Sequence, residues 1–264
     1  MTHYGDLDVS RLTEKPAGRK PIVTRKFMLE RLEDVIDGLR RALAQGAQIY
    51  WVCPLIESSE VSELAAAEER HAHLTQVLGP CVGLLHGGMS GTAKDAVMQA
   101  FSDNKLQVLV ATTVIEVGVN VPNATIMVIE HAERFGLAQL HQLRGRVGRS
   151  DRQSFCMLLY KSPLGETAQK RLDMLCNTED GFLIAETDLE LRGGGEVLGA
   201  RQSGLPEFRV AEVPGMPVLL AAARDDAMLI LSRDPELASL RGQALRTLLY
   251  LFECDEAVRL FRAA

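Results

Sequence analysis

The chain has 264 residues, of which 47% are hydrophobic, and this length suits one full α/β domain with a smaller appendage. Its formal net charge is −6, so no global field draws it to nucleic acid and any DNA contact must come from local basic patches. The five scattered cysteines form no Cys-x-x-Cys pair, so we expect neither zinc nor disulfides. No signal peptide or membrane-length apolar stretch is visible, so we expect a reducing, cytoplasmic setting and no membrane partner.

The N-terminal part of the sequence predicts a linker and then a helix. Residues 1–22 carry Pro16 and Gly18 among mixed charges, a composition typical of an irregular linker. Apolar residues then recur at helical spacing from Arg25 to Gln45, which predicts a helix with one buried stripe that stops before Gly46.

A continuous apolar run within Gln48–Ile56 marks the first expected strand, and strands of this kind are covered on both faces in a parallel sheet. Helical and strand patterns alternate after it, which predicts a doubly wound, mainly parallel α/β sheet with helices on both faces. We expect helices at Ser59–Leu78 and Ser90–Phe101, and strands at Cys81–His86, Leu106–Ala111, Ala124–Glu130 and Ser154–Tyr160.

The strand signal ends at Tyr160, and helical patterns follow. Gly165–Asn177 and Glu179–Leu191 predict two helices joined by a tight turn, and a helical tail follows an irregular stretch that ends near Pro217. The expected division is therefore a linker at 1–22, an α/β domain at 23–161, and a helical hairpin, loop and small helical region at 162–264.

Residues 142–149, Gln-Leu-Arg-Gly-Arg-Val-Gly-Arg, place three arginines on a glycine-jointed turn. Glycines let a backbone bend tightly, and arginine forks grip phosphate in a bidentate way. No phosphate-cradling loop occurs elsewhere in these residues, so the turn is interpreted as half of an active site. The residues alone leave open a solvated basic turn, since short Arg/Gly strings are common.

Two further segments lie where parallel strands end, at the sheet edge that binds ligands in open α/β folds. Val110–Pro122 follows one expected strand, and Leu84–Ser90 joins another strand to a helix through a glycine-rich turn. Such a turn presents backbone N–H groups and the positive end of a helix to an anion. A purely structural strand-to-helix turn is the alternative for both segments.

The arginine string resembles the closing motif Gln-x-x-Gly-Arg-x-Gly-Arg in the second RecA-like domain of superfamily 2 helicases. The resemblance implies that Arg149 is an arginine finger, that Arg146 makes a second phosphate or coupling contact, and that Gln142 senses the γ-phosphate. Such a finger contributes about 10³–10⁵ to the rate of phosphoryl transfer.

The strand-end segments are similar to helicase motifs as well. The resemblance implies that Thr112 holds a nucleic-acid phosphate and that the loop of Gly87 lies on the nucleic-acid backbone. It also implies that Gly118 and Asn120 face the nucleotide ribose. Relatives typically carry Asp at the second of these positions, whereas Asn brings no charge.

Thr187–Gly204 resembles the translocation motif shared by RecG-type fork-reversal helicases and bacterial transcription-repair coupling factors. In these proteins a helical hairpin and the following loop lever against the ATPase core and drive double-stranded DNA. Arg171, Arg192 and Gln202 match the polar positions of the motif. A helix-capping role is the alternative for the glycine run.

Tyr4–Ser10 and Trp51–Glu57 extend the similarity to the RecG family of ATP-dependent branched-DNA helicases over almost the whole chain. This resemblance implies a RecA-like motor domain that acts on forks and Holliday junctions in recombination and repair. It further implies ATP and Mg²⁺ held mainly by a first RecA-like domain which, like the family's wedge domain, lies outside these residues. We expect a monomer in the bacterial cytoplasm, at the nucleoid, and an inactive isolated fragment.

Two alternatives to this function remain. One is the motor portion of a transcription-repair coupling factor, and the other is a catalytically dead RecA-like scaffold module. No metal site is expected, since His71 and His73 on a helix face apart. Trp51 lies in mid-strand and is interpreted as a core residue rather than a base-stacking platform.

Overall fold

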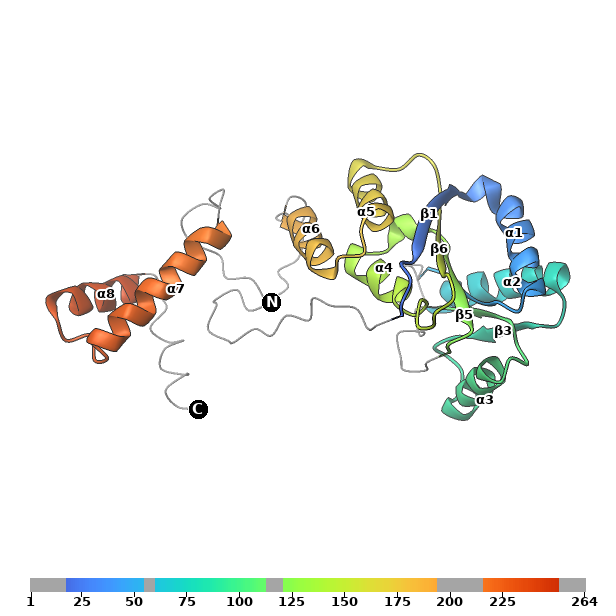
Figure 1. The fold of residues 1–264 in the computed structure, drawn as a ribbon, viewed down its shortest axis with the longest axis horizontal. Coiled ribbons are helices and arrows are strands. Elements are labelled where there is room, and N and C mark those ends of the chain that lie inside the picture. The colour runs from blue at the N-terminus through green and yellow to red at the C-terminus, as the bar shows by residue number, and fades with distance from the viewer. Residues whose placement is uncertain (1–17, 55–59, 113–120, 194–215, 252–264) are drawn as a thin grey trace. The chain divides into compact units, whose positions relative to one another are not determined.

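The structure, a computed structural model, describes residues 18–54, 60–112, 121–193 and 216–251. These residues fall into two compact units, one within Lys15–Gly199 and the other within Ala200–Ala264. The first unit contains the sheet (Figure 1). The second contains helices α7 (Met216–Arg233) and α8 (Leu240–Leu251).

The first unit is built on a six-stranded sheet with the order β1-β6-β5-β2-β4-β3. Every neighbouring pair of strands is parallel, which confirms the expected parallel α/β fold. Because the strands are parallel, their carboxyl ends all meet at one edge of the sheet. The strands are β1 (Val23–Met28), β2 (Gln48–Val52), β3 (Val82–Leu85), β4 (Val108–Ala111), β5 (Ala124–Ile129) and β6 (Phe155–Tyr160).

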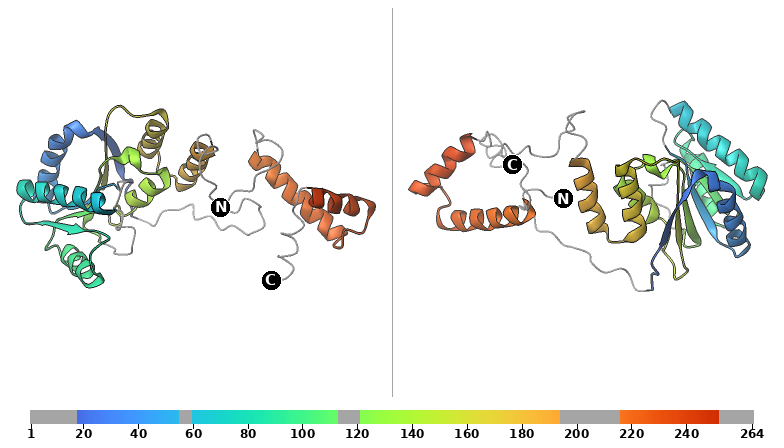
Figure 2. Two further views of the ribbon diagram at one scale, coloured as in Figure 1. Left: turned by 180° about the vertical axis from the view of Figure 1, so that it is seen from behind. Right: turned by 90° about the horizontal axis from the view of Figure 1, so that it is seen from above.

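Helices lie over both faces of the sheet (Figure 2). The buried apolar side chains form one cluster on each face. One face packs on α1 (Leu32–Ala44) and α2 (Glu60–Leu78) around the fully buried Trp51, which confirms that this tryptophan is a core residue. The opposite face packs on α3, α4, α5 and α6 around Tyr50. These helices span Gly91–Ser102, Leu137–Arg144, Glu166–Asn177 and Gly181–Gly193.

The prediction of a helix from Arg25 was wrong over its first turns. Residues Val23–Met28 form strand β1, which pairs in parallel with β6, and the α-helix begins only at Leu32. Met28 was the first residue of the expected apolar stripe, but it ends β1 and is 45% exposed, whereas the stripe from Leu32 onward lies in α1. Pairing with β6 supplies the backbone hydrogen bonds of β1, so tertiary structure overrides the local pattern.

The other expected elements of this unit are present with shifts of a few residues at their ends. The expected helical pair after residue 162 corresponds to α5 and α6, and both lie in the same compact unit as the sheet. The functional division at residues 161 and 162 stays a prediction.

The expected helical tail corresponds to α7 and α8 of the second unit. Asp234 organises the connection between these helices by accepting hydrogen bonds from the backbone N–H groups of Ala238 and Ser239 at 2.8 and 3.0 Å.

Candidate functional site

The arginine turn, defined as residues 142–149, begins in the last turn of α4 and continues past its C-cap Gly145. Leu140, Leu143 and Val147 are buried in the sheet cluster and fix the turn to the domain. Gly148 has a φ of +74°, and a Cβ atom placed on it would lie 2.8 Å from the Cγ1 atom of Ile22. The backbone shape therefore requires glycine at this position.

The side chains assigned to the nucleotide lie on the outer part of this turn. Gln142 is exposed, and Arg146 and Arg149 are half-buried. The Nε atom of Arg149 donates a hydrogen bond to the carbonyl oxygen of Gly145 at 3.3 Å. Burial raises the pKa of Tyr50 to about 12, although the charges of Arg149 and Arg146 act in the opposite direction. The turn thus carries two guanidinium groups near the surface of a well-packed core.

Arg144 differs from the other arginines of the turn, because its side chain is only 2% exposed. Its guanidinium donates to the carbonyl oxygens of Leu175 and Thr178 at 2.6 and 2.8 Å. Sequence reasoning missed this role, although the signal was available: Leu137, Leu140 and Arg144 share the i, i+3, i+7 spacing of a buried helical stripe.

Thr112 and the loop of Gly87 lie at the carboxyl ends of the neighbouring strands β4 and β3. The backbone N–H of Thr112 donates to the carbonyl oxygen of Leu85 at 3.2 Å, and the Thr112 side chain is buried. The carbonyl oxygen of Gly87 accepts from the Lys94 ammonium at 2.7 Å. Ser90 caps α3 by accepting from the N–H of Ala93 at 3.3 Å. The fold therefore brings these two predicted segments together at one sheet edge.

The predicted translocation residues are only partly visible. Arg171 lies on α5, and its guanidinium donates to the carbonyl oxygens of Phe135 at 2.7 Å and Glu133 at 3.4 Å. These carbonyls belong to the segment that follows β5, so Arg171 connects the helical pair to the sheet domain. Arg192 belongs to α6, but its side chain is outside the described residues. Gly118, Asn120 and Gln202 also lie outside the described residues.

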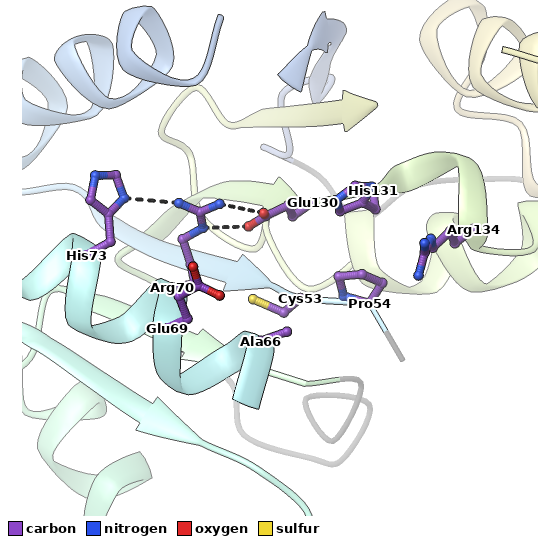
Figure 3. A pocket seen from close by; sticks show the side chains of 9 residues that line it. All are labelled: Cys53, Pro54, Ala66, Glu69, Arg70, His73, Glu130, His131 and Arg134. Atoms are coloured by element: carbon purple, nitrogen blue, oxygen red, sulfur yellow. Dashed lines mark hydrogen bonds and ion pairs between the residues drawn. The ribbon is translucent and has the colours of Figure 1, made fainter. Parts of the chain in front are cut away.

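Sequence reasoning did not find a pocket of about 500 Å³ at the carboxyl ends of β2 and β5 (Figure 3). It lies at the same sheet edge as Thr112, beside the strand that precedes that residue. The only available signal was the polar sequence that follows the apolar strand β5. The lining residues are Cys53, Pro54, Ala66, Glu69, Arg70, His73, Glu130, His131 and Arg134.

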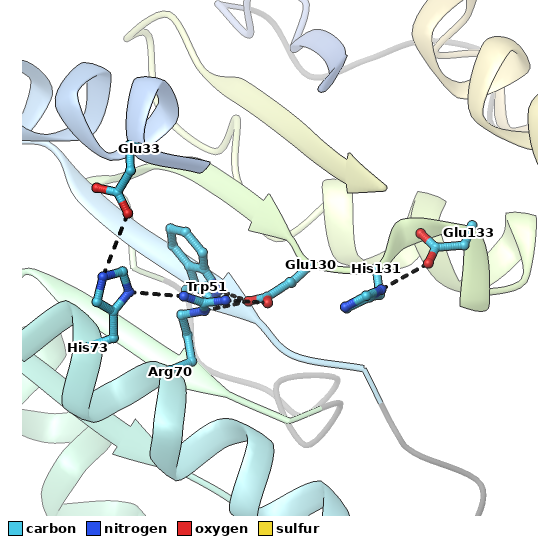
Figure 4. Close-up of polar contacts among 7 residues, drawn as sticks. All are labelled: Glu33, Trp51, Arg70, His73, Glu130, His131 and Glu133. Carbon is cyan, nitrogen blue, oxygen red and sulfur yellow. Dashed lines mark hydrogen bonds and ion pairs between the residues drawn. The ribbon is translucent and has the colours of Figure 1, made fainter. Parts of the chain in front are cut away.

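One wall of this pocket is a buried polar network around Glu130, which is 7% exposed (Figure 4). Its carboxylate accepts from Trp51 Nε1 at 2.9 Å and from two nitrogens of Arg70 at 2.8 and 2.6 Å. Burial alone would lower the pKa of Arg70, but the hydrogen bond and charge of Glu130 outweigh it and raise that pKa. This bidentate pair fixes α2 to β5.

The same pair affects the chemistry of the pocket thiol. Burial raises the pKa of Cys53, and the charge of Glu130 raises it further. A buried thiol of this kind stays protonated and inert. Cys53 is therefore a packing residue and no nucleophile.

His131 and Glu133 form a second polar pair after β5, at the opposite side of the pocket (Figure 4). His131 has a φ of 50°, and its Nδ1 atom lies 2.9 Å from Glu133 Oε1. Burial would raise the pKa of Glu133, but the hydrogen bond from His131 and the Lys161 N–H together lower it. The contact with Glu133 fixes the His131 ring, which lines the pocket at the carboxyl edge of the sheet.

Two family models match the chain. The helicase conserved C-terminal domain matches residues 29–151, and the C-terminal part of domain 3 of the ATP-dependent DNA helicase RecG matches residues 178–249. A curated relative, the ATP-dependent DNA helicase RecG of Pasteurella multocida, is 49% identical over 241 residues, which are 90% of this chain and 35% of the relative. The chain belongs to the RecG family.

Other RecG proteins agree with this placement. RecG of Escherichia coli strain K12 is 54% identical over 81% of this chain and 31% of its own length. RecG of Bacillus subtilis is 46% identical over 94% of this chain and 37% of its own length. The chain thus spans about a third of the length of the RecG relatives that it matches.

A solved structure of RecG bound to a three-way DNA junction is 40% identical to this chain, with a TM-score of 0.63, and the match covers 82% of this chain and 26% of the solved chain. This similarity supports the RecA-like fold. Within the part of the chain that the structure describes, no helix combines the length and apolar character needed to cross a membrane.

Proposed function

We propose that this chain supplies the second RecA-like motor domain of an ATP-dependent helicase that remodels branched double-stranded DNA, at replication forks and Holliday junctions. The observation that carries this proposal is the arginine turn, in which the positive φ of Gly148 and the buried Val147 hold Arg146 and Arg149 near the surface. The RecG relative bound to a three-way junction supports branched DNA as the substrate class.

The turn acts on ATP in trans. Charge builds on the equatorial oxygens of the transferred phosphoryl group, and Arg149 neutralises it while Arg146 contacts a second phosphate and Gln142 senses the γ-phosphate. Two guanidinium groups fit a triphosphate by charge. Among the described residues, no group of three or more His, Cys, Asp or Glu side chains offers a metal site. In this proposal Mg²⁺ and most of the ATP are held by the first RecA-like domain, and Gly118 and Asn120 contribute the ribose contact.

DNA binds along the carboxyl edge of the sheet. Thr112 and the backbone of Gly87 contact phosphates there. The strands that precede them, β4 and β3, are neighbours, which supports a single DNA-binding surface formed by both residues. The helical pair, with Arg171, Arg192 and Gln202, forms the lever that drives the duplex. The proposed functional division is a linker at 1–22, the motor domain at 23–161 and the translocation region at 162–264. The working form is a monomer with its own wedge and first RecA-like domain, at the nucleoid in the bacterial cytoplasm.

The rival functions are less well supported. The match of residues 178–249 to the RecG domain 3 model favours RecG over a transcription-repair coupling factor. A dead scaffold would have no need of a turn that only glycine can form at position 148 and that carries Arg149.

The test is fork reversal by the full-length protein, measured beside its DNA-stimulated ATPase rate. Arg192→Ala and Gln202→Ala should leave ATP hydrolysis in place and abolish fork reversal. Arg149→Ala should abolish ATP turnover, by about 10³-fold or more, while DNA binding is retained. A parallel loss of both activities in the Arg192 and Gln202 variants would reject the lever, and an active Arg149→Ala variant would reject the finger.

A further inference from the structure

Arg144 uses its guanidinium inside the protein, although it lies within the arginine turn. Its Nη1 atom donates to the carbonyl oxygens of Leu175 and Thr178, and its Nη2 atom donates to His141 Nδ1 at 2.9 Å. With an exposed fraction of 2%, it has no access to a phosphate. A buried cation is costly unless hydrogen bonds compensate it, so these partners account for its position.

The two carbonyl partners lie at the end of α5, where a helix leaves its last carbonyl groups without helical partners. Leu175 is in the last turn of α5, and Thr178 is its C-cap. Burial lowers the pKa of Arg144, while the nearby Cys156 and Glu179 act against this shift. Arg144 thus works as a C-terminal cap supplied by a different helix.

A second contact joins the same two parts of the fold. A Cβ atom on Gly181, the first residue of α6, would lie 3.2 Å from His141 Nε2, so the start of α6 lies directly against α4. The turn between α5 and α6 therefore sits on the last turn of α4 through Arg144 and His141. This last turn of α4 directly precedes the segment that carries Arg146 and Arg149.

We propose that Arg144 is a positioning residue that couples the arginine turn to the α5–α6 turn, so that changes at the nucleotide move the helical pair. The proposal rests on the function proposed above. The proposal assigns two roles to one motif: Arg146 and Arg149 contact the nucleotide, and Arg144 contacts the helical pair. The buried Leu140, Leu143 and Val147 hold the turn to the sheet independently of Arg144. Loss of Arg144 should therefore loosen the coupling more than the nucleotide site.

The test uses Arg144→Lys in the full-length protein. Lysine keeps the charge, but its single nitrogen cannot serve the two carbonyl oxygens and His141 Nδ1 together, which Arg144 reaches through Nη1 and Nη2. The number of base pairs unwound per ATP hydrolysed should fall about five- to tenfold, while the ATPase kcat and the KM for ATP change less than about twofold. Arg152→Lys is the matched control, since Arg152 is exposed and makes a single contact of 3.4 Å with the carbonyl oxygen of Gln45.

A purely structural role would lower stability and both activities together, and an unchanged unwinding yield would also overturn the proposal. Should Arg144→Lys fail to fold, as thermal unfolding would show, Gly181→Val is the second variant, because its side chain would push α6 away from His141 and leaves the Arg144 residue itself unchanged. A reduced yield per ATP in that variant supports the coupling, and an unchanged yield rejects it. A wild-type protein without either activity would reject the proposed function itself, and the inference with it.

Discussion

Single residues of the arginine turn have different roles because they lie at different depths. Arg144 is buried and caps α5, whereas Arg149 is half-buried and makes one long contact with the carbonyl oxygen of Gly145. Gly148 makes this arrangement possible, since it lies between the two arginines and its positive φ turns the chain there. Depth, rather than residue type, decides which arginine can meet a ligand.

Gly148→Ala should destabilise the domain for two reasons, a strained φ of +74° and a clash with Ile22. The strain costs on the order of 1–3 kcal/mol, and overpacking adds about 1 kcal/mol or more. Gly46→Ala is the control, because Gly46 has a φ of +77° but no atom within 4 Å of its added Cβ. Urea unfolding measures both variants. Equal losses of unfolding free energy would show that Ile22 yields freely and that the clash is absent.

At the level of elements, the helical pair is attached to the sheet domain by three contacts, which involve β1, α4 and the segment after β5. Lys26 of β1 forms an ion pair with Asp173 of α5. Arg144 of α4 reaches the end of α5, and Arg171 of α5 reaches the segment after β5. Two of these contacts end on backbone carbonyl groups, which substitution of a side chain cannot remove. The three contacts therefore anchor α5 to the sheet domain.

Arg171→Gln should loosen α5 locally, since glutamine is too short to replace both hydrogen bonds to Phe135 and Glu133. A net loss of about 1 kcal/mol corresponds to about fivefold faster amide exchange in α5. Hydrogen–deuterium exchange by mass spectrometry measures this effect. The exposed neighbour Lys170 supplies the control, Lys170→Gln, and identical exchange in the two variants would show that Arg171 does not hold the helix.

At the scale of the whole molecule, the proposed function makes the chain one half of a motor. Phosphoryl transfer depends on groups placed on both sides of the nucleotide, and positioning contributes much of the rate. This chain spans about a third of the length of its RecG relatives, and in the proposed function its arginine turn supplies cations to one side. Complete activity therefore needs the remaining domains.

The isolated chain should fold, bind ATP weakly and hydrolyse none, even with branched DNA present. Circular dichroism establishes the fold, and a phosphate-release assay measures hydrolysis beside the full-length protein at equal concentration. The Arg149→Ala fragment is the matched control for contaminating enzymes. DNA-stimulated hydrolysis by the wild-type fragment that disappears in this control would contradict the requirement for a second motor domain.

Local patterns were sufficient for most elements of the sheet domain. Continuous apolar runs such as the one in β2 indicate a strand covered on both faces, and this is how the central strands are buried. The edge strand β1 was missed because none of its residues is fully buried and its mixed sequence lacks such a run. The pocket and the pair of Arg70 with Glu130 were also missed, because the partners are distant in sequence and neither has a local signal.

The sequence by itself determined the parallel α/β class, the arginine turn and the family, because these depend on short-range patterns and contiguous motifs. Only the tertiary structure decided that Val23–Met28 is a strand and that Arg144 faces the helical pair rather than a phosphate. Both depend on which distant backbone groups come within hydrogen-bonding distance. Such pairing is a property of the packed chain, and a local pattern does not contain it.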